Sequence, residues 1–488
     1  MTGLAEIAEV VRGRVVVDGA VSVDAVSVDD VSVDDVYADS RQVRPGALFC
    51  CVPGRRTDGH DHARDAVEAG AVALLCERPL QVDVPQVVVE EVRRAMGPAA
   101  ALVHGHPADS LDLVGVTGTN GKTTVVAMVE SILRAAGRSA RAIGTLTGAR
   151  TTPEAPDLQR QLRRFVDEGV DSVAMEVSSH ALAMHRVDGM VFDVAAFTNL
   201  GVDHLDFHGT PEAYFTAKAR LFDEDVSRAG VVNVDDVHGR LLLDASGGRC
   251  TGVSLDDTTD LRTGRDGTTL TWRGLRLRIP LPGRHNATNA LLAAQTCRVL
   301  GIDDDAIVQG LAELPVVPGR FETFVAPSGT TVVVDYAHTP DALESVLRAA
   351  RSIGDPSTRL TVVFGCGGDR DRGKRPLMGS VAADLADRVV ITTDNPRSED
   401  PAAIAAEVRA GALAARSEDR EHPAVVEEVP DRAEAIRRAV QEAGPHDVVV
   451  IAGKGHEQGQ EFRDRVEPFD DAEVVRSVIS PAEGAADR

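Results

Sequence analysis

The chain has 488 residues, of which 43% are hydrophobic and 26% are charged. At roughly 100 to 200 residues per domain this length predicts several domains with buried cores, and it excludes collagen, disordered and coiled-coil proteins. The 76 acidic residues outnumber the 52 basic ones, and the formal net charge of -24 would repel a nucleic acid. A small anionic ligand stays possible, because a few arginines and helix N-termini can hold it locally.

The first residues, MTGLAEIAEVVRG, lack the basic start and the apolar run of a signal peptide. No stretch approaches the ~18 apolar residues of a membrane span, so we expect a cytoplasmic protein without one. The oligomeric state is not readable from the sequence, and a monomer is expected. The six cysteines have neither metal-ligand spacing nor the density of a disulfide scaffold, so we expect them to be buried free thiols. They are Cys50, Cys51, Cys76, Cys250, Cys297 and Cys366.

Only four of the 52 basic residues are lysines: Lys122, Lys218, Lys374 and Lys454. A chain that otherwise uses arginine keeps a lysine where a compact ammonium, or an amine able to lose its proton, is required. The alternative is that GC-rich coding bias left four lysines at random.

In the first 108 residues, the run VSVDAVSVDDVSVDDV alternates apolar with Ser and Asp positions, which predicts a half-exposed strand. A strand, a loop and a small α/β unit are predicted to follow it. From about 109 to 316, LDLVGVTG predicts a strand that enters a glycine-rich turn, and KTTVVAMVESILRAAG predicts a helix with Gly137 just past its end. VDSVAME and FDVAAFTN have the near-continuous apolar runs of a parallel sheet buried on both faces.

From about 317 to 488 strands and helices alternate, which predicts a doubly wound sheet. The predicted strands are TTVVVDYA, RLTVVFG, DRVVITT and DVVVIAG, with helices from Pro340, near 376 to 387 and from Pro401. Ligands of such sheets bind outside the carboxyl ends of the strands. Four unusual segments follow those ends and should share one edge: AHTP, CGGDRDRGKRP, DNPRSEDP and GKGHE.

The segment GVTGTNGKTT, residues 115 to 124, lies between a predicted strand and helix, as a phosphate-binding loop requires. Its glycines let backbone N–H groups point at phosphate, Lys122 would reach the β and γ oxygens, and Thr123 would bind Mg²⁺. Val116 occupies the first glycine position of the strict pattern. The alternative is a glycine-rich turn without a ligand.

Glu176 ends one predicted strand and His204 follows the next, so both should face the phosphate loop. Glu176 could carry Mg²⁺ directly or through water. His180, His204 and His208 could instead be helix caps or core hydrogen-bonding groups.

A helix is predicted from Thr210 and Pro211, an N-cap and a first-turn proline. Lys218 falls within its apolar stripe, with aromatic or aliphatic residues one turn before and after. Desolvation would lower the pKa of this lysine and favour the neutral amine, which can react with CO₂ or act as a base. A lysine that extends its ammonium to solvent is the alternative.

The motifs GTNGKTT, MEVSSHAL, FTNLGVDHLDFHGT, YFTAKARLF, GRHNATNALLA, DYAHTPDAL, GCGGDRDRGKRP, DNPR and GKGHE resemble, in order and spacing, those of the Mur ligases. The resemblance runs from Asp39 to Glu457. It implies an α/β protein with a UDP-substrate-binding domain (1–108), a central ATP-binding P-loop domain with a mostly parallel sheet (109–316) and a C-terminal Rossmann-like domain for the amino acid (317–488).

The resemblance also implies an ATP-dependent ligase of peptidoglycan precursor synthesis that works through an acyl phosphate. Its substrates would be ATP, UDP-N-acetylmuramoyl-L-alanyl-D-glutamate and an amino acid, with Mg²⁺ as cofactor. Transfer of the family roles gives a carbamate formed from CO₂ on Lys218, and a catalytic set of Lys122, Lys218, His204 and Glu176. The implied metal ligands are Thr123, Glu176, His204 and Lys218.

The implied ATP contacts are Gly118, Thr119, Asn120, Gly121, Lys122, Thr123, Thr124, Asn289, Asp335 and His338. The implied contacts to the UDP-muramoyl-dipeptide are Ala38, Ser40, Arg55, Arg56, Thr151, Thr152, Ser178, Arg186 and Lys218. The sequence departs from the family at Met184, where a glutamine is usual.

The incoming amino acid in the family is usually meso-diaminopimelate or L-lysine, which differ by one distal carboxylate. Arg397 follows Pro396 at a strand end, where a guanidinium can pair with that carboxylate in bidentate fashion. We therefore expect meso-diaminopimelate, bound by Arg370, Asp394, Asn395, Pro396, Arg397, Gly453 and Glu457. In the alternative, Arg397 only pairs with Glu399 or Asp400 on the surface.

Three other functions remain open: a ligase that adds L-lysine, a folate polyglutamate synthase-like ligase, and a catalytically silent nucleotide-binding regulator. The phosphate loop of the folate enzymes usually carries G-K-G-S, whereas this chain has GKTT. The intact Lys122, Lys218, Glu176 and His204 argue against a silent regulator.

Overall fold

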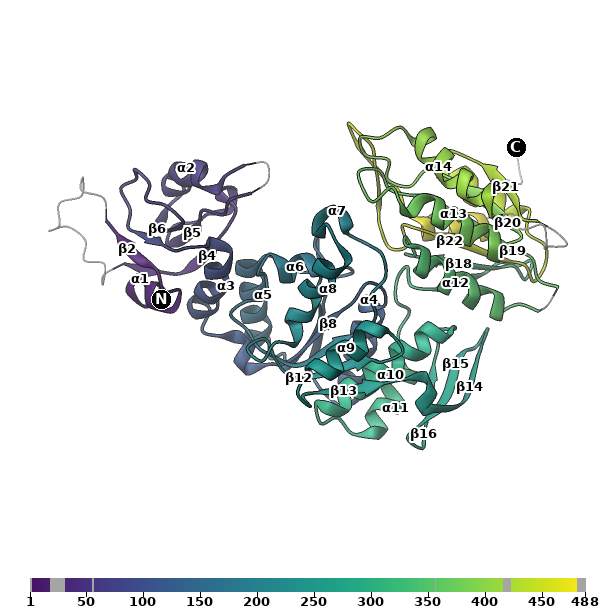
Figure 1. Ribbon diagram of the computed structural model, residues 1–488, viewed down its shortest axis with the longest axis horizontal. Helices are drawn as coiled ribbons and strands as arrows, with labels where there is room; N and C mark the ends of the chain where they lie inside the picture. The colour runs from purple at the N-terminus through teal and green to yellow at the C-terminus, as the bar shows by residue number, and fades with distance from the viewer. Residues whose placement is uncertain (1, 18–30, 55–56, 356, 416–422, 481–488) are drawn as a thin grey trace, which may run out of the picture.

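The computed structural model describes residues 2–17, 31–54, 57–355, 357–415 and 423–480. They form three α/β units that follow one another along the chain, from the purple N-terminal unit to the green and yellow C-terminal unit in Figure 1. The predicted α/β class with three domains is confirmed. Arg55, Arg56 and most of the alternating valine run lie outside the described residues. In the part of the chain that is described, no helix has the length and apolar content needed to cross a membrane.

The N-terminal unit contains a five-stranded sheet in the order β2-β7-β6-β5-β4, in which only β2 runs antiparallel to its neighbour. The apolar runs of β5 and β6 are buried, which explains their pairing at the centre. The elements are β1 (Thr2–Gly3), α1 (Leu4–Val10), β2 (Arg14–Val16), β3 (Ser32–Val33), β4 (Asp35–Tyr37), η2 (Ser40–Gln42), β5 (Ala47–Cys50), η3 (Gly59–His62), α2 (Ala63–Glu68), β6 (Ala71–Cys76), β7 (Gln86–Val88) and α3 (Val92–Val103).

Helix α3 packs against α5 of the central unit, which joins the two units closely. A side chain at Gly97 in α3 would place its Cβ 2.3 Å from the carbonyl oxygen of Asp188, so only glycine permits this approach. Arg160 of α5 donates to Asp35 at 2.9 Å and to the carbonyl of Val36 at 2.7 Å. Burial would raise the pKa of Asp35, but hydrogen bonds from His104 and Arg160 lower it below its usual value. The N-terminal unit is therefore anchored to the central unit by a partly buried ion pair.

The central unit is built on a six-stranded sheet in the order β13-β12-β11-β8-β10-β9, and every pair in it is parallel. The predicted strands and phosphate-loop helix are confirmed as β8, β10, β11 and α4. The elements are η4 (Pro107–Ser110), β8 (Asp112–Thr117), α4 (Lys122–Ala135), β9 (Ala140–Ile143), α5 (Ala155–Asp167), β10 (Ser172–Glu176), α6 (Ser179–Ala183), β11 (Phe192–Phe197), α7 (Leu205–His208), α8 (Pro211–Ala219), η5 (Arg220–Phe222), β12 (Ser227–Asn233), α9 (Val237–Ala245) and β13 (Cys250–Val253).

A three-stranded antiparallel sheet, β14-β15-β16, follows the parallel sheet and was not predicted. It packs its Leu270, Trp272 and Leu277 side chains into the same core as helix α10 and lies at the lower right of Figure 1. The elements of this part are η6 (Leu255–Asp257), β14 (Thr258–Gly264), β15 (Gly267–Trp272), β16 (Leu275–Ile279), α10 (Arg284–Val299) and α11 (Asp304–Ala312).

The C-terminal unit contains a six-stranded sheet in the order β17-β18-β22-β19-β20-β21, parallel except for the edge strand β17. All four predicted strands and three predicted helices are present. The elements are β17 (Glu322–Val325), β18 (Thr331–Asp335), α12 (Pro340–Ser352), β19 (Leu360–Phe364), α13 (Lys374–Leu385), β20 (Arg388–Ile391), α14 (Pro401–Ala414), β21 (Val425–Glu428), α15 (Arg432–Gln441), β22 (Val448–Ala452), β23 (Gly459–Glu461), β24 (Val466–Pro468) and α16 (Asp471–Ile479).

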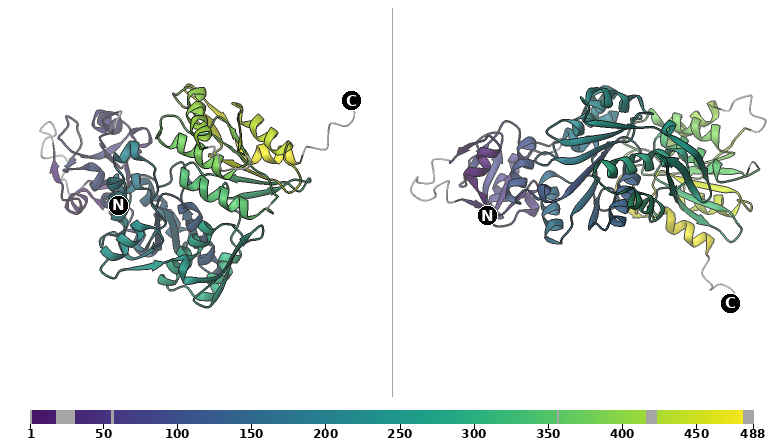
Figure 2. Two further views of the ribbon diagram at one scale, coloured as in Figure 1. Left: turned by 45° about the vertical axis from the view of Figure 1, so that its right-hand side comes forward. Right: turned by 90° about the horizontal axis from the view of Figure 1, so that it is seen from below.

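The two views of Figure 2 show the C-terminal unit beside the central unit, with the N-terminal unit at the other end of the molecule. The strands of the central sheet are parallel, and so are those of the C-terminal sheet apart from β17. In each sheet the loops that follow the parallel strands therefore lie at one edge. All six cysteines are buried and free, as predicted.

Candidate active site

The loop between β8 and α4 has the backbone that a phosphate-binding loop needs. Gly118 and Gly121 have φ values of +142° and +90°, which favour glycine. A Cβ on Gly118 would also lie 1.8 Å from the hydroxyl oxygen of Thr198. Val116 lies within β8, so the turn begins two residues after the position where the strict motif has its first glycine. The departure from that motif therefore leaves the turn intact.

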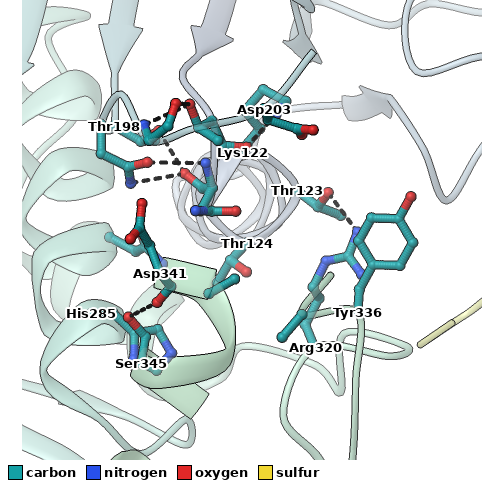
Figure 3. Close-up of a pocket in the computed structure, with 18 of the residues that line it drawn as sticks. Lys122, Thr123, Thr124, Thr198, Asp203, His285, Arg320, Tyr336, Asp341 and Ser345 are labelled. Carbon is teal, nitrogen blue, oxygen red and sulfur yellow. Dashed lines mark hydrogen bonds between the residues drawn. The ribbon is translucent and has the colours of Figure 1, made fainter. Parts of the chain in front are cut away.

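This loop borders a cavity of about 520 Å³ between the central and C-terminal units. Figure 3 shows the side chains of both units that point into it. The cavity brings together nearly all the predicted ATP contacts: Thr119, Asn120, Gly121, Lys122, Thr123, Thr124, Asn289, Asp335 and His338. Of the predicted set, only Gly118 is absent from its lining.

The ammonium of Lys122 rests on its own loop. Its Nζ donates to the carbonyl oxygens of Gly118 at 3.0 Å and Thr119 at 2.9 Å. Burial lowers the pKa of Lys122, while the carboxylates of Glu176 and Asp203 act in the opposite direction. Anionic phosphate oxygens would be stronger acceptors for this ammonium than the two carbonyls.

Arg320 joins the two units across the cavity, and sequence reasoning missed it. Its Nη2 donates to the hydroxyl of Thr123 at 3.1 Å, and its guanidinium lies 4.4 Å from the centre of the Tyr336 ring (Figure 3). The only signal for it is its place in VPGRF, just after a Pro-Gly turn. A fixed cation at this position lies beside the predicted Mg²⁺ ligand and can contact a polyphosphate.

Lys218 is 1% exposed, so the alternative of a side chain that extends to solvent is wrong. Its Nζ donates to the carbonyl of Gly118 at 2.6 Å and lies 4.5 Å from the centre of the Tyr214 ring. Burial, reinforced by the charge of Lys122, lowers the pKa of Lys218 well below its usual value. The predicted lowering of this pKa is therefore seen for a lysine that lies directly beneath the phosphate loop.

Three histidines from α6, α7 and the loop before α7 pack together, and two of them, His204 and His208, lie near the Tyr214 ring that Lys218 contacts. The ring of His180 lies 4.8 Å from that of His204 and 5.5 Å from that of His208, and His208 also contacts the hydroxyl of Ser179 at 2.9 Å. Burial lowers the pKa of His204 to about 3 and that of His180 to about 4. Neutral imidazoles of this kind can bind a metal ion.

Glu176 ends β10 and is 1% exposed. Its Oε1 accepts a hydrogen bond from the backbone N–H of Thr145 at 2.8 Å, and glycine at position 144 leaves room for the carboxylate. Among the described residues no group of three His, Cys, Asp or Glu side chains could hold a metal by itself. This donor set suits Mg²⁺ that is bound through one carboxylate, a hydroxyl and substrate phosphates.

Asp203 was also missed, although it directly precedes His204 in the sequence. Its carboxylate lies 3.3 Å from Nε2 of His204 and 3.6 Å from Nε2 of His338. Burial would raise the pKa of Asp203, but the hydrogen bond and charge of His338 lower it below its usual value. It links the loop after β11 to the loop after β18.

The loops after β20 and β22 meet at the edge of the C-terminal sheet. The Nδ2 of Asn395 donates to Glu457 at 2.8 Å, and a Cβ on Gly453 would lie 2.8 Å from Oδ2 of Asp394. The structure therefore brings together most of the side chains predicted to bind the amino acid. None of the residues predicted to bind the amino acid lines the 520 Å³ cavity.

Arg397, the predicted specificity residue, has an unusual φ of +50°. Its Nε donates to Glu461 at 2.9 Å, and its Nη1 donates to the carbonyl of Gly368 at 2.8 Å. The alternative pairing with Glu399 or Asp400 is wrong, since the carboxylate partner is Glu461 on β23. Arg370 extends from the neighbouring loop and is exposed.

The residues predicted to bind the UDP substrate lie in two places. Ala38 and Ser40 belong to the N-terminal unit, while Thr151 and Ser178 line the cavity. Thr152 is fully buried, and its hydroxyl donates to the carbonyl of Glu176 at 2.9 Å.

Arg186 donates to the carbonyl of Thr152 at 3.0 Å and pairs with Glu154 at 2.8 Å. It also lies 3.7 Å from the sulfur of Met184, so a weak acceptor stands where the family has a glutamine. Thr152, Glu154 and Arg186 are therefore linked by hydrogen bonds and an ion pair, and Thr152 also binds the end of β10.

Comparison with known proteins agrees with this geometry. Three family models match in succession: the Mur ligase family catalytic domain over residues 32–115, the Mur ligase middle domain over 116–297, and the Mur ligase glutamate ligase domain over 319–455. A UDP-N-acetylmuramoyl-L-alanyl-D-glutamate–2,6-diaminopimelate ligase of Streptomyces avermitilis is 44% identical over 91% of this chain and 92% of its own length. The ligase of that name from Synechococcus elongatus is 45% identical over 92% of this chain and 94% of its own.

Among solved structures, a ligase of the same name superimposes with a TM-score of 0.67 at 33% identity, covering 98% of this chain and 99% of the other. The folylpolyglutamate synthase of Mycobacterium tuberculosis, solved with ADP and AMPPCP, superimposes with a TM-score of 0.57 at 21% identity. The match covers 72% of this chain and 91% of the other, and at this identity it shows a shared fold only. The chain belongs to the Mur ligase family.

Proposed function

We infer that this chain adds meso-diaminopimelate to UDP-N-acetylmuramoyl-L-alanyl-D-glutamate, at the expense of ATP, in peptidoglycan precursor synthesis. The observation that carries this inference is the similarity, over 91% of the chain at 44% identity, to a curated ligase of that specificity. The two polar sheet edges support it, since one borders the 520 Å³ cavity and the other carries Arg397, Asp394 and Glu457 on its loops.

The chemistry begins at the carboxylate of the dipeptide, which has no leaving group at neutral pH. We propose that a carboxylate oxygen attacks the γ-phosphorus of ATP, and that the bond between this phosphorus and the β,γ-bridging oxygen breaks to give ADP and an acyl phosphate. The amine of the incoming amino acid then attacks the acyl carbon, and phosphate leaves as the amide forms and the amine loses its proton. Such a transfer depends mainly on positioning and charge neutralisation.

Lys122 neutralises charge on the phosphates in this scheme. To do so its ammonium exchanges the carbonyls of Gly118 and Thr119 for phosphate oxygens. The helix N-terminus of α4 supplies backbone N–H groups to the same oxygens. Arg320, held against Tyr336, adds a second cation on the opposite side of the cavity.

Mg²⁺ would be held by Thr123 and Glu176 at one position and by His204 and Lys218 at another. Bound there, Mg²⁺ neutralises phosphate charge and polarises the transferred group. The donor chemistry fits, because Glu176 is a buried carboxylate at the loop and His204 is a neutral imidazole.

The Lys218 site requires a covalent change to become anionic. We propose that its neutral Nζ attacks the carbon of CO₂, forming an N–C bond, and that the nitrogen then releases one proton to leave a carbamate. Complete burial and the lowered pKa of Lys218 support this step. The carbamate would replace a buried neutral amine by an anion next to the phosphate loop.

For binding of the UDP substrate we propose the residues that were predicted from the sequence. Ala38 and Ser40, with Arg55 and Arg56, would bind the uridine nucleotide. Thr151, Thr152, Ser178 and Arg186 would bind or position the muramoyl peptide, and the limits at 108 and 316 would separate the domains. We propose that the protein acts as a cytoplasmic monomer.

An omission experiment tests the proposal. ADP release should require ATP, the UDP-muramoyl-dipeptide and meso-diaminopimelate together, and mass spectrometry should find the amide-linked product. Dihydrofolate with glutamate should give no ADP above background. ADP release that is independent of the UDP substrate, or absent with all three substrates and Mg²⁺, would contradict the proposal.

A further inference from the structure

Lys454 is the least exposed of the four lysines, and the proposed reaction does not use it. Its side chain is 0% exposed, and it follows Gly453 in the loop after β22. Burial of an ammonium is costly unless the charge is paired and its donors are satisfied. The partners of this ammonium therefore indicate what it does.

All three donors of the Lys454 ammonium find oxygen acceptors. Its Nζ lies 2.9 Å from Oδ1 of Asn395, 3.2 Å from Oε2 of Glu457 and 3.5 Å from Oδ1 of Asp394. The first two contacts are full hydrogen bonds, and the third is longer and mainly an ion pair. These three acceptors belong to the set that we propose to bind meso-diaminopimelate.

The contacts of Lys454 join two loops whose strands are not neighbours. Strand β19 lies between β20 and β22 in the sheet. The loops can meet over its end because residue 365 is glycine, where a Cβ would lie 2.2 Å from the carbonyl oxygen of Thr392. The bridge from Lys454 thus fixes the distance between the DNPR and GKGHE segments.

Lys454 also fixes the orientation of the Asn395 amide. Oδ1 of Asn395 accepts from Nζ of Lys454 and from the backbone N–H of Glu461, both at 2.9 Å. Its Nδ2 donates to Oε2 of Glu457 at 2.8 Å. Reversal of the amide would place its NH₂ group against two donors, so only one orientation is favourable.

Glu457 is positioned by the same bridge. Its Oε2 receives both the Lys454 ammonium and the Asn395 amide, whereas its side chain is 33% exposed and reaches the surface of the edge. The other oxygen, Oε1, accepts no hydrogen bond from any residue in the described part of the chain. The carboxylate therefore presents one free oxygen to a ligand with a cationic group, such as the ammonium of an amino acid.

We propose that Lys454 is a positioning residue for the incoming diamino acid, which holds Asn395, Asp394 and Glu457 in the geometry that binds it. This proposal rests on the proposed function, because it assumes that the edge of the C-terminal sheet binds meso-diaminopimelate. Lys454 touches neither the substrate nor the reacting atoms, and it acts through the three side chains that it orders.

The test is steady-state kinetics of Lys454→Met, which removes the charge and keeps a side chain of similar length. The KM for meso-diaminopimelate should rise roughly tenfold to a hundredfold, because buried acceptors lose their partner. The KM for ATP and for the UDP-muramoyl-dipeptide should not change, and kcat at saturating diaminopimelate should fall much less than kcat/KM. A general loss of structure would instead affect all three substrates.

Arg388→Met is a matched control in the same sheet. Arg388 begins β20, at the end opposite DNPR, and its cation also bridges two carboxylates, those of Glu427 and Glu442. Its removal should lower the melting temperature and leave the KM for diaminopimelate unchanged. Lys454→Gln provides a second variant, neutral but still polar, if Lys454→Met does not fold.

The outcomes separate this inference from the proposed function. If wild-type protein does not use meso-diaminopimelate at all, the proposed function fails. If wild-type protein uses it and the folded Lys454 variants have an unchanged KM for it, the role of Lys454 is overturned. An equal rise of KM for all three substrates would also overturn it, since it would indicate a structural role only.

Discussion

The edges of the central and C-terminal sheets both collect lysines at the carboxyl ends of parallel strands, but they hold these lysines differently. In the central unit, Lys122 and Lys218 donate to backbone carbonyls of the phosphate loop. In the C-terminal unit, Lys454 donates to one amide and pairs with two carboxylates.

The difference indicates two strategies of ligand binding. The carbonyl contacts of Lys122 are exchangeable, because anionic phosphate is a better acceptor for an ammonium than a neutral carbonyl. The contacts of Lys454 satisfy its charge internally, so this edge is preorganised before the amino acid arrives. Substitutions should therefore act on turnover at the central edge and on amino acid affinity at the C-terminal edge.

The largest effect is expected for Lys122. Lys122→Arg keeps the charge but not the compact ammonium that fits between the loop and the phosphates, so kcat should fall by roughly a hundredfold to a thousandfold. Measurement of kcat at saturating substrates checks this, with Arg134→Ala at the exposed end of α4 as the control. A kcat within a few-fold of wild type would contradict the role of Lys122.

A loss of about a hundredfold in kcat is expected for Lys218→Ala, because the proposed carbamate would be absent. A short carboxylic acid in solution should restore part of the activity by occupying the space left by the carbamate. Activity is measured with and without this acid, and no rescue is expected for Lys122→Arg. Full activity of Lys218→Ala without any acid would disprove the carbamate.

Arg397→Ala should lower kcat/KM for meso-diaminopimelate by well over tenfold, since loss of a charged hydrogen bond to a substrate costs about 2 to 5 kcal/mol. The KM for ATP should stay the same, because the residue lies outside the cavity lining. Titration of diaminopimelate against wild type and variant measures the change. Unaltered KM and kcat would mean that Arg397 serves only its Glu461 partner.

A smaller effect on the KM for meso-diaminopimelate is expected for Glu461, the ion-pair partner of Arg397. Glu461 is half exposed, and in the proposed complex it would compete with a substrate carboxylate for the guanidinium of Arg397. Glu461→Gln should thus lower the KM for meso-diaminopimelate by about fivefold at most, as expected for a partly solvated ion pair. A rise in KM would show that Glu461 orients Arg397 instead of competing for it.

The smallest effect concerns pH and the central cavity. Burial lowers the pKa of His285, which lines the cavity, to about 4. An unfolded histidine binds its proton near pH 6.5, so the unfolded state binds more protons between about pH 6.5 and 4, and stability is lost as the pH falls through this range. His285→Phe should make the free energy of unfolding less dependent on pH in urea titrations across it. An equal pH dependence of the free energy of unfolding in the wild type and the variant would contradict the lowered pKa of His285.

Much of the fold could be predicted because apolar periodicity determines it. The parallel strands, the helix from Pro211 and the shared edge of the C-terminal sheet all follow from apolar runs and cap residues. The antiparallel sheet β14–β16 was not predicted, although Leu275, Leu277 and Ile279 alternate in β16. Such a short alternation next to charged turns is a weak signal.

The site could be predicted only in part, for a physical reason. Motif order indicates which loops meet, but side-chain pairing depends on packing between residues far apart in the chain. Arg320 reaches Thr123 across 197 positions, and Lys454 reaches Asn395 across 59. The scarcity of lysine was the more useful signal, since Lys218, Lys374 and Lys454 are all buried.

Amino acid selection by the wild-type protein is the most direct test of the proposed specificity. With ATP, Mg²⁺ and the UDP-muramoyl-dipeptide present, equal concentrations of meso-diaminopimelate and L-lysine compete in one reaction, and mass spectrometry separates the two products. We expect the diaminopimelate product to dominate, because Arg397 can pair with the distal carboxylate that lysine lacks. Predominant formation of the lysine product, or of neither product while ADP is released, would contradict the assignment of this ligase.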